Sequence, residues 1–243
     1  MLTNDSSLLK MTLAEIVTAD SRTAAVFDGL GLDYCCHGHD TLLDSCVDRA
    51  VPVSAVVDQL VALGPAPEGT DGDASPDLTE IVHQIVTRHH RYVREMTPVI
   101  TAWLEKLTGR HGTRHPELHQ VRATFLALAD EMDAHMQKEE TMLFPFIEGL
   151  DGAAKQQRPA PPSPFGTLLN PIRVMESDHR EAGDALSRLR VLTNGYVPPD
   201  DACTTYRLCY RELAAFEADL HRHVHLENHV LFPRAIALEG TMA

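Results

Sequence analysis

The sequence predicts an all-α protein, in which a small helical N-terminal domain precedes an antiparallel four-helix bundle. Apolar residues recur at helical spacing in every long segment, and no segment competes as a strand. Loops rich in Gly and Pro divide the second part of the chain into four such segments. Four helices joined by loops bury their apolar faces most simply as an antiparallel bundle.

Residues 1–63 are predicted to form the small domain. TLAEIVTADSRTAAVFDGLGL and PVSAVVDQLVAL both place apolar residues at helical spacing. A unit of about 60 residues buries little apolar surface, so we expect it to lean on the rest of the chain. Residues 64–76 lie in LGPAPEGTDGDASPD, whose Gly, Pro and Asp content is typical of a linker.

Residues 77–240 are predicted to form the bundle. Its four helices are expected at residues 77–107, 116–150, 168–192 and 201–238. The first ends at TGRHG, and the second begins near Pro116, a residue favoured in a first helical turn. The Pro-rich stretch DGAAKQQRPAPPSPFG and the segment TNGYVPPD form the other two loops. Pro145 and Pro233 are expected to kink or end their helices, because each removes a helical hydrogen bond.

The composition limits the class of function. The chain has 243 residues, of which 44% are apolar, as in a globular protein with a real core. Asp and Glu number 35 against 21 Lys and Arg, and the net charge of -14 argues against nucleic acid or an anionic membrane as partner. Five cysteines, no signal-peptide pattern and no membrane-length apolar run predict a cytoplasmic protein. A homodimer is compatible with this composition.

One phrase occurs twice. HMQKEETMLFP begins at His135 and HVHLENHVLFP at His223, and each reads His, three residues, Glu, three residues, Leu-Phe-Pro. Residues i and i+4 share one face of a helix, so His135 points the same way as Glu139, and His223 the same way as Glu227. The repeat is either a packing device, with solvated His and Glu pairs, or two halves of one site.

The positions of four histidines favour one site. They are His90, His135, His179 and His223. In antiparallel neighbours, two residues at one height have their sequence midpoint in the connecting loop, and the midpoints of all three successive pairs fall in predicted loops. His90 and His179 are 89 residues apart, and the two repeats are 88 apart, as in a duplicated helix pair. We therefore expect one histidine from each helix in a single layer.

Four imidazoles and two carboxylates form a nitrogen and oxygen ligand set, and bundle cores are where dinuclear carboxylate centres occur. The set permits iron, zinc or manganese, and its lack of thiolates disfavours an iron–sulfur cluster. Glu131 and Asp219 each lie four residues before a repeat histidine and are candidates to accept its second ring N–H.

Several other residues of the same helices receive lesser assignments. Asp178 and Glu176 could also accept the second ring N–H of a ligand histidine or line an entry path, and His83 is the substitute ligand. Four histidines are expected at the surface: His89, His221, His225 and His229.

Cys35 and Cys36 in LDYCCHGHDTL are the second chemical feature. Adjacent cysteines rarely form a structural disulfide, and two thiols in this turn could handle iron, nitric oxide or redox equivalents. A buried packing pair is the alternative. The other three cysteines, Cys46, Cys203 and Cys209, show no ligand spacing.

The motifs DYCCHG, HMQKEETMLFP, VMESDHREAG and HVHLENHVLFPRA resemble those of the iron–sulfur cluster repair di-iron proteins, the repair-of-iron-centres family, over nearly the whole chain. The resemblance implies a Cys-containing N-terminal domain joined to a hemerythrin-like bundle that holds two non-haem iron ions with an oxo or hydroxo bridge. It implies that Glu139 and Glu227 bridge the irons and that the terminal ligands are His90, His135, His179 and His223. His37 and His39 stand where many relatives have a Gly pair and a basic residue.

The resemblance implies repair of iron–sulfur clusters damaged by nitric oxide or oxidative stress, with damaged iron–sulfur proteins as partners. Iron donation and nitric oxide reduction at the di-iron centre both stay open, and so does its status as an enzyme. The alternatives are a di-iron sensor or carrier of nitric oxide or oxygen, and a bundle with a structural zinc or manganese. A plain sensor bundle would not need the cysteine-containing domain.

Overall fold

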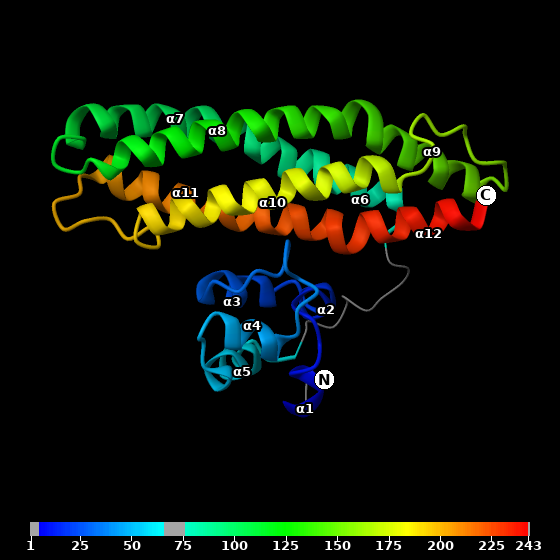
Figure 1. Ribbon diagram of the computed structural model, residues 1–243, viewed down its shortest axis with the longest axis horizontal. Coiled ribbons are helices and arrows are strands. Elements are labelled where there is room, and N and C mark those ends of the chain that lie inside the picture. The colour runs from blue at the N-terminus through cyan, green and yellow to red at the C-terminus, as the bar shows by residue number, and fades with distance from the viewer. Residues whose placement is uncertain (1–4, 66–75, 243) are drawn as a thin grey trace. The chain divides into compact units, whose positions relative to one another are not determined.

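The computed structural model describes residues 5–65 and 76–242. Within these residues every regular element is a helix, and the one β-bridge, between Thr12 and Thr41, is isolated. The predicted all-α class is therefore confirmed (Figure 1). The chain divides into two compact units. One combines Met1–Asp77 with His221–Arg234, and the other combines Leu78–Leu220 with Ala235–Ala243.

The first unit contains five short helices: α1 (Asp5–Leu8), α2 (Leu13–Ala19), α3 (Thr23–Leu30), α4 (Leu42–Asp48) and α5 (Val53–Ala62). Thr12 begins α2 with a capping box, in which its hydroxyl accepts from Glu15 N at 3.1 Å and the Glu15 carboxylate accepts from Thr12 N at 2.8 Å. Thr41 caps α4 in a similar way. The bridge between these two threonines fixes where both helices start, and so frames the turn before α4.

Side chains from the segment His221–Arg234 complete this unit. His221 Nδ1 lies 2.8 Å from the Asp28 carboxylate, and His225 Nδ1 lies 3.3 Å from the carbonyl oxygen of Tyr34. The expectation that the N-terminal helices lean on a distant part of the chain agrees with these contacts. The limits 1–63 and 77–240 stay a prediction, and the linker at 64–76 falls largely outside the described residues.

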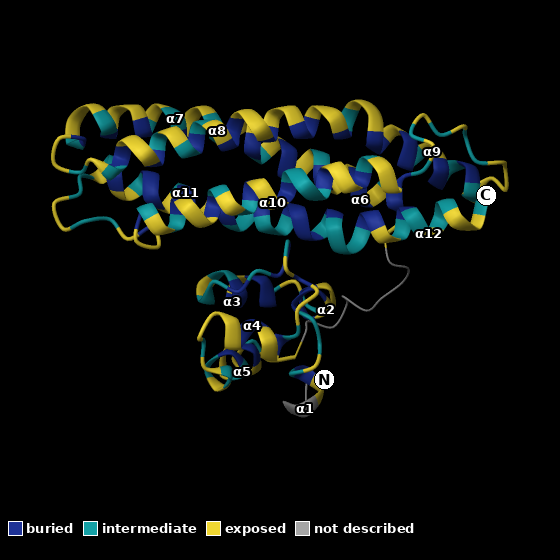
Figure 2. Ribbon diagram, viewed as in Figure 1, coloured by how far each residue is buried: buried dark blue, intermediate teal, exposed yellow. Residues whose placement is uncertain are grey.

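The second unit contains most of the four long helical segments, and only His221–Arg234 of the fourth belongs to the first unit. The first is α6 (Leu78–Gln84), η1 (Ile85–His90) and α7 (Arg91–His111), and the second is α8 (Glu117–Lys138), η2 (Glu139–Leu143) and α9 (Phe144–Lys155). The third is α10 (Leu169–Leu192), and the fourth is α11 (Thr204–His225), η3 (Leu226–Leu231) and α12 (Phe232–Met242). Helix α8 packs on both α7 and α10, and Phe216 of α11 contacts Phe125 of α8 and Tyr92 of α7. Buried residues line the inner faces of these helices (Figure 2).

Three of the four long segments contain one wide π-helical turn, η1, η2 or η3. Pro145 and Pro233 each follow such a turn, and the α-helix resumes at Phe144 and Phe232. Of the two predicted outcomes, the helices do not end at these prolines, because the wider turn accommodates the missing N–H donor, and a kink stays a prediction. Single π turns inside α-helices occur frequently at functional sites.

Candidate metal centre

The six predicted ligand side chains are all buried, with exposed fractions of 0% or 1%. They form two groups, in each of which potential ligand atoms lie within 4.8 Å of one another. The first group is His90, Glu139, His223 and Glu227, and the second is His135, Glu139, His179 and Glu227. Each group thus has two histidines of its own, while both groups share the two glutamates. The structure brings the six residues together as the layer argument expected, and metal binding by them stays a prediction.

The imidazole Nε2 atoms face the glutamates. His223 Nε2 lies 2.8 Å from Glu227 Oε1, and His135 Nε2 lies 3.3 Å from Glu139 Oε2. The Nε2 atoms of His135 and His179 are 3.0 Å apart. Two ligand atoms on one ion have about this separation when their bonds are about 2.1 Å long and meet at an angle of about 90°. The donor set therefore fits two metal ions of borderline hardness, each with two imidazoles and a share of two carboxylates.

Two outer carboxylates hold the imidazole rings from behind. Glu140 Oε1 lies 2.6 Å from His90 Nδ1, and Asp178 Oδ2 lies 3.3 Å from His135 Nδ1. Burial alone raises the pKa of Glu140, but hydrogen bonds from Arg94 and His90 outweigh it and lower the pKa below its usual value. An anionic partner on Nδ1 fixes the tautomer that presents the Nε2 lone pair to a metal.

The sequence indicated Asp178 but not Glu140. Glu140 lies directly after Glu139, at the second position of the π turn η2. Helical spacing of 3.6 residues per turn gives no signal for it, because a π turn changes the direction of the side chains that follow.

Replacing Glu140 by glutamine is expected to weaken iron binding about tenfold, because His90 would lose its anionic partner. A titration of Fe²⁺ against a competing chelator measures the change. Glu95→Gln is the matched control, since Glu95 is exposed and its nearest ion-pair contact is Arg91 at 3.8 Å. Equal affinities in the two variants would contradict the role of Glu140.

Several assignments of outer residues need correction. His89 and His225 are buried, with exposed fractions of 1% and 4%, whereas the sequence predicted them at the surface. Asp219 lies 3.1 Å from His89 Nδ1, which is the interaction seen for it in place of the expected one with His223. Glu131 and the substitute ligand His83 are both exposed. For His89, which lies in η1, the side-chain direction had been taken from an uninterrupted α-helix. His225 lies in α11 and is buried because its ring packs beside Tyr34.

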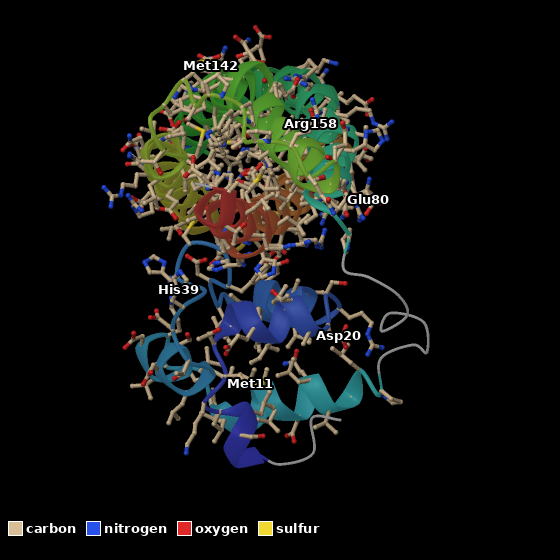
Figure 3. All side chains as sticks on the ribbon, turned by 90° about the vertical axis from the view of Figure 1, so that its right-hand side faces the viewer. Met11, Asp20, His39, Glu80, Met142 and Arg158 are labelled. Atoms are coloured by element: carbon tan, nitrogen blue, oxygen red, sulfur yellow. The ribbon has the colours of Figure 1, made fainter. Side chains whose placement is uncertain are left out.

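The cysteine pair lies in the turn between α3 and α4. Cys35 is buried, Cys36 is half-buried, and their Sγ atoms lie 3.8 Å apart without a disulfide bond between them. The hydrogen bond with Cys36, together with burial, raises the pKa of the Cys35 thiol. The exposed His39 follows the turn (Figure 3). Its ring centroid lies 4.9 Å from that of His229. A thiol role for the pair stays a prediction.

None of the helices in the described part of the chain has the length and apolar character needed to span a bilayer. Residues 82–235 match the family described as Hemerythrin HHE cation binding domain, and residues 9–64 match a domain of unknown function, DUF542.

The chain is also similar to curated proteins along almost its whole length. It is 36% identical over 228 residues to the iron-sulfur cluster repair protein YtfE of Cronobacter sakazakii, covering 93% of this chain and 96% of the relative. It is 33% identical to the protein of the same name from Musicola paradisiaca, covering 94% of this chain and 97% of the relative. With a hemerythrin domain that spans more than half of the chain and relatives that match both of its parts, the protein belongs to the YtfE family of iron–sulfur cluster repair proteins.

Proposed function

We propose that this chain is a cytoplasmic non-haem di-iron protein that repairs iron–sulfur clusters damaged by nitric oxide or oxidative stress. The main support is the pair of buried His and Glu groups that share Glu139 and Glu227, in a chain whose relatives are named as repair proteins. The described residues include five cysteines and no disulfide among them, which suits a reducing compartment.

In this proposal His90 and His223 hold one iron, and His135 and His179 hold the other. Glu139 and Glu227 lie in both groups and would bridge the two ions. The iron pair, with its oxo or hydroxo bridge, would supply stored electrons and positions open to nitric oxide or oxygen.

The protein itself would orient the imidazole rings and shield the carboxylates from water. Glu140 and Asp178 hold two rings with Nε2 inward, and the complete burial of Glu139 and Glu227 keeps water from competing for the carboxylates. Damaged iron–sulfur proteins would be the partners, and Cys35 and Cys36 would supply thiols for the exchange. Each iron would have two imidazoles of its own and a share of two carboxylates, which leaves room for nitric oxide to bind or for the iron to leave. Iron donation and nitric oxide reduction are therefore both compatible with the site.

The test is a repair assay with the iron-loaded full chain. A [4Fe–4S] hydro-lyase inactivated by nitric oxide is incubated with the protein, and recovery of its activity is measured. We expect recovery with the unaltered chain, and a loss of at least tenfold in the initial rate with His135→Ala or Glu227→Ala, since each removes a predicted ligand.

Two exposed residues provide matched controls. His83→Ala and Glu131→Ala remove a histidine and a glutamate from helices of the same bundle, and both variants should keep full activity. Iron-loaded protein that binds nitric oxide reversibly and restores no hydro-lyase would overturn repair in favour of the sensor or carrier function.

A further inference from the structure

A second group of potential metal ligands lies apart from the six residues above. Asp33, Cys35 and Cys36 place a carboxylate oxygen and two sulfurs within 4.8 Å of one another. Cys35 Sγ lies 3.2 Å from Asp33 Oδ1 and 3.8 Å from Cys36 Sγ. All three residues belong to one turn of the first unit, so the group is complete within that unit.

The distance between the sulfurs fits an ion held by both. Two metal–sulfur bonds of about 2.3 Å at a tetrahedral angle place their sulfurs about 3.8 Å apart. A disulfide would instead need a separation of about 2.05 Å, and adjacent cysteines reach it only with strain. The turn therefore presents the thiols at the spacing of metal ligands.

Hydrogen bonds hold this turn from two sides. Asp33 Oδ1 accepts from the backbone N–H groups of Cys35 and Cys36 at 3.0 and 2.9 Å. The carbonyl oxygen of Cys35 accepts from His229 Nε2 at 2.8 Å and from Asn228 Nδ2 at 3.4 Å. The direction of both sulfurs is thus set before any ion binds, which lowers the entropy lost on binding.

One side of the group stays open to solvent. Cys36 and Asp33 are half-buried, and the exposed His37 places its Nδ1 2.7 Å from Asp33 Oδ2. Three protein ligands leave a coordination position for water or an incoming group, as in zinc sites that exchange their fourth ligand, whereas closed structural sites fill all four positions.

Asn228 and His229, which hydrogen-bond the Cys35 carbonyl, belong to a helical segment that also contains two of the six predicted iron ligands. Residues two apart in a helix point to opposite sides, so His225 and His229 face away from His223 and Glu227. One side of this segment presents metal ligands, and the other positions the cysteine turn.

We propose that Asp33, Cys35 and Cys36 form a third metal site, which binds one thiophilic divalent cation in exchangeable form. The identity of that cation as Fe²⁺, on its way to a client protein, rests on the proposed repair function. Binding would release the thiol protons to solvent and form two metal–thiolate bonds, with no change in oxidation state. Two thiolates and a carboxylate bind softer ions than the nitrogen and oxygen set of the bundle, so the two sites would differ in affinity and exchange rate.

The test is a titration of the reduced, metal-free full chain with Co²⁺. Only thiolate ligands give an intense thiolate-to-cobalt charge-transfer band in the near ultraviolet, so Co²⁺ bound in the bundle does not contribute to it. We expect the final intensity of the band to correspond to about one thiolate-bound cobalt per chain, and the band to be absent in Cys36→Ala and in Cys35→Ser/Cys36→Ser. Asp33→Asn should weaken binding at least tenfold, because asparagine keeps the acceptor for the turn and loses the charge.

Cys203→Ser is the matched control, since it removes a half-buried thiol from a different loop. The helicity of each variant and the iron that it retains after desalting are measured in parallel, and Cys36→Ala, at a half-buried position, should keep its helicity. Absence of the band in the unaltered chain, with its thiols shown to be reduced, would overturn the proposal. So would a band that survives in the double variant. Normal iron content in these cases would leave the bundle proposal standing.

Discussion

Replacing Glu227 by alanine is expected to remove both metal ions from the bundle, whereas replacing His179 should remove one. Glu227 contributes to both ligand groups, and His179 contributes to only one of them. After anaerobic loading and desalting, the unaltered chain should retain about two irons, His179→Ala about one, and Glu227→Ala close to none. The His179 variant keeps the whole group of His90, Glu139, His223 and Glu227, which is why one ion should stay.

Glu131→Ala controls for the loss of a carboxylate, because Glu131 is exposed on α8. Metal analysis of the four proteins under one loading protocol gives the comparison. A Glu227 variant that keeps its full iron content would contradict the bridging assignment. Equal loss in the Glu227 and His179 variants would contradict two ions with separate histidine pairs.

Gly38→Ala is expected to destabilise the first unit by about 1–3 kcal/mol, the range found for overpacking a tightly packed site. A Cβ at this position would overlap the carbonyl oxygen of Tyr34 and lie 2.6 Å from His229 Nε2. Since the carbonyl belongs to the backbone, the turn itself must shift, and the hydrogen bond from His229 to Cys35 would be strained. Chemical denaturation measures the free energy, and the alkylation rate of the buried Cys35 reports local opening.

Gly29→Ala is the control for this substitution. Gly29 lies in α3, and a Cβ there would meet no atom within 4 Å. Alanine is favoured over glycine inside helices by roughly 0.5–1 kcal/mol, so this variant should be unchanged or slightly more stable. Faster alkylation of Cys35 in the Gly29 variant than in the Gly38 variant would contradict the packing argument.

Much of the fold could be predicted from the sequence because its signals are local. The four long segments begin and end within a few residues of the predicted limits, since Gly- and Pro-rich loops punctuate a helical apolar pattern. The π turns could not be predicted in this way. A π turn depends on which side chains pack around it. A search for apolar residues every 3.6 positions assumes regular α-helix, so it cannot detect the extra residue that a π turn contains.

The candidate metal centre was also predicted only in part. The repeat of His135 and Glu139 in His223 and Glu227, together with the loop midpoints, was enough to select all six residues that the structure brings together. In antiparallel neighbouring helices, the distance of a residue from the connecting loop gives its height along the bundle. Of the two carboxylates behind those residues, Asp178 was indicated by the sequence, and Glu140 was accessible only in three dimensions. Glu140 is directed at His90 by a π turn, and Asp219 meets His89, from another helix.

The sequence by itself determined the helical class, the candidate ligand residues and their common layer, since these follow from periodicity along one chain. Only the tertiary structure decided how the cysteine turn is held. Cys35 is bound by Asn228 and His229, some 190 residues further along the chain, and contacts at that separation arise from packing between elements and leave no periodic trace. The hydrogen bonds that hold the cysteine turn are therefore a property of the fold, and the common layer of the four histidines and two glutamates is a property of the sequence pattern.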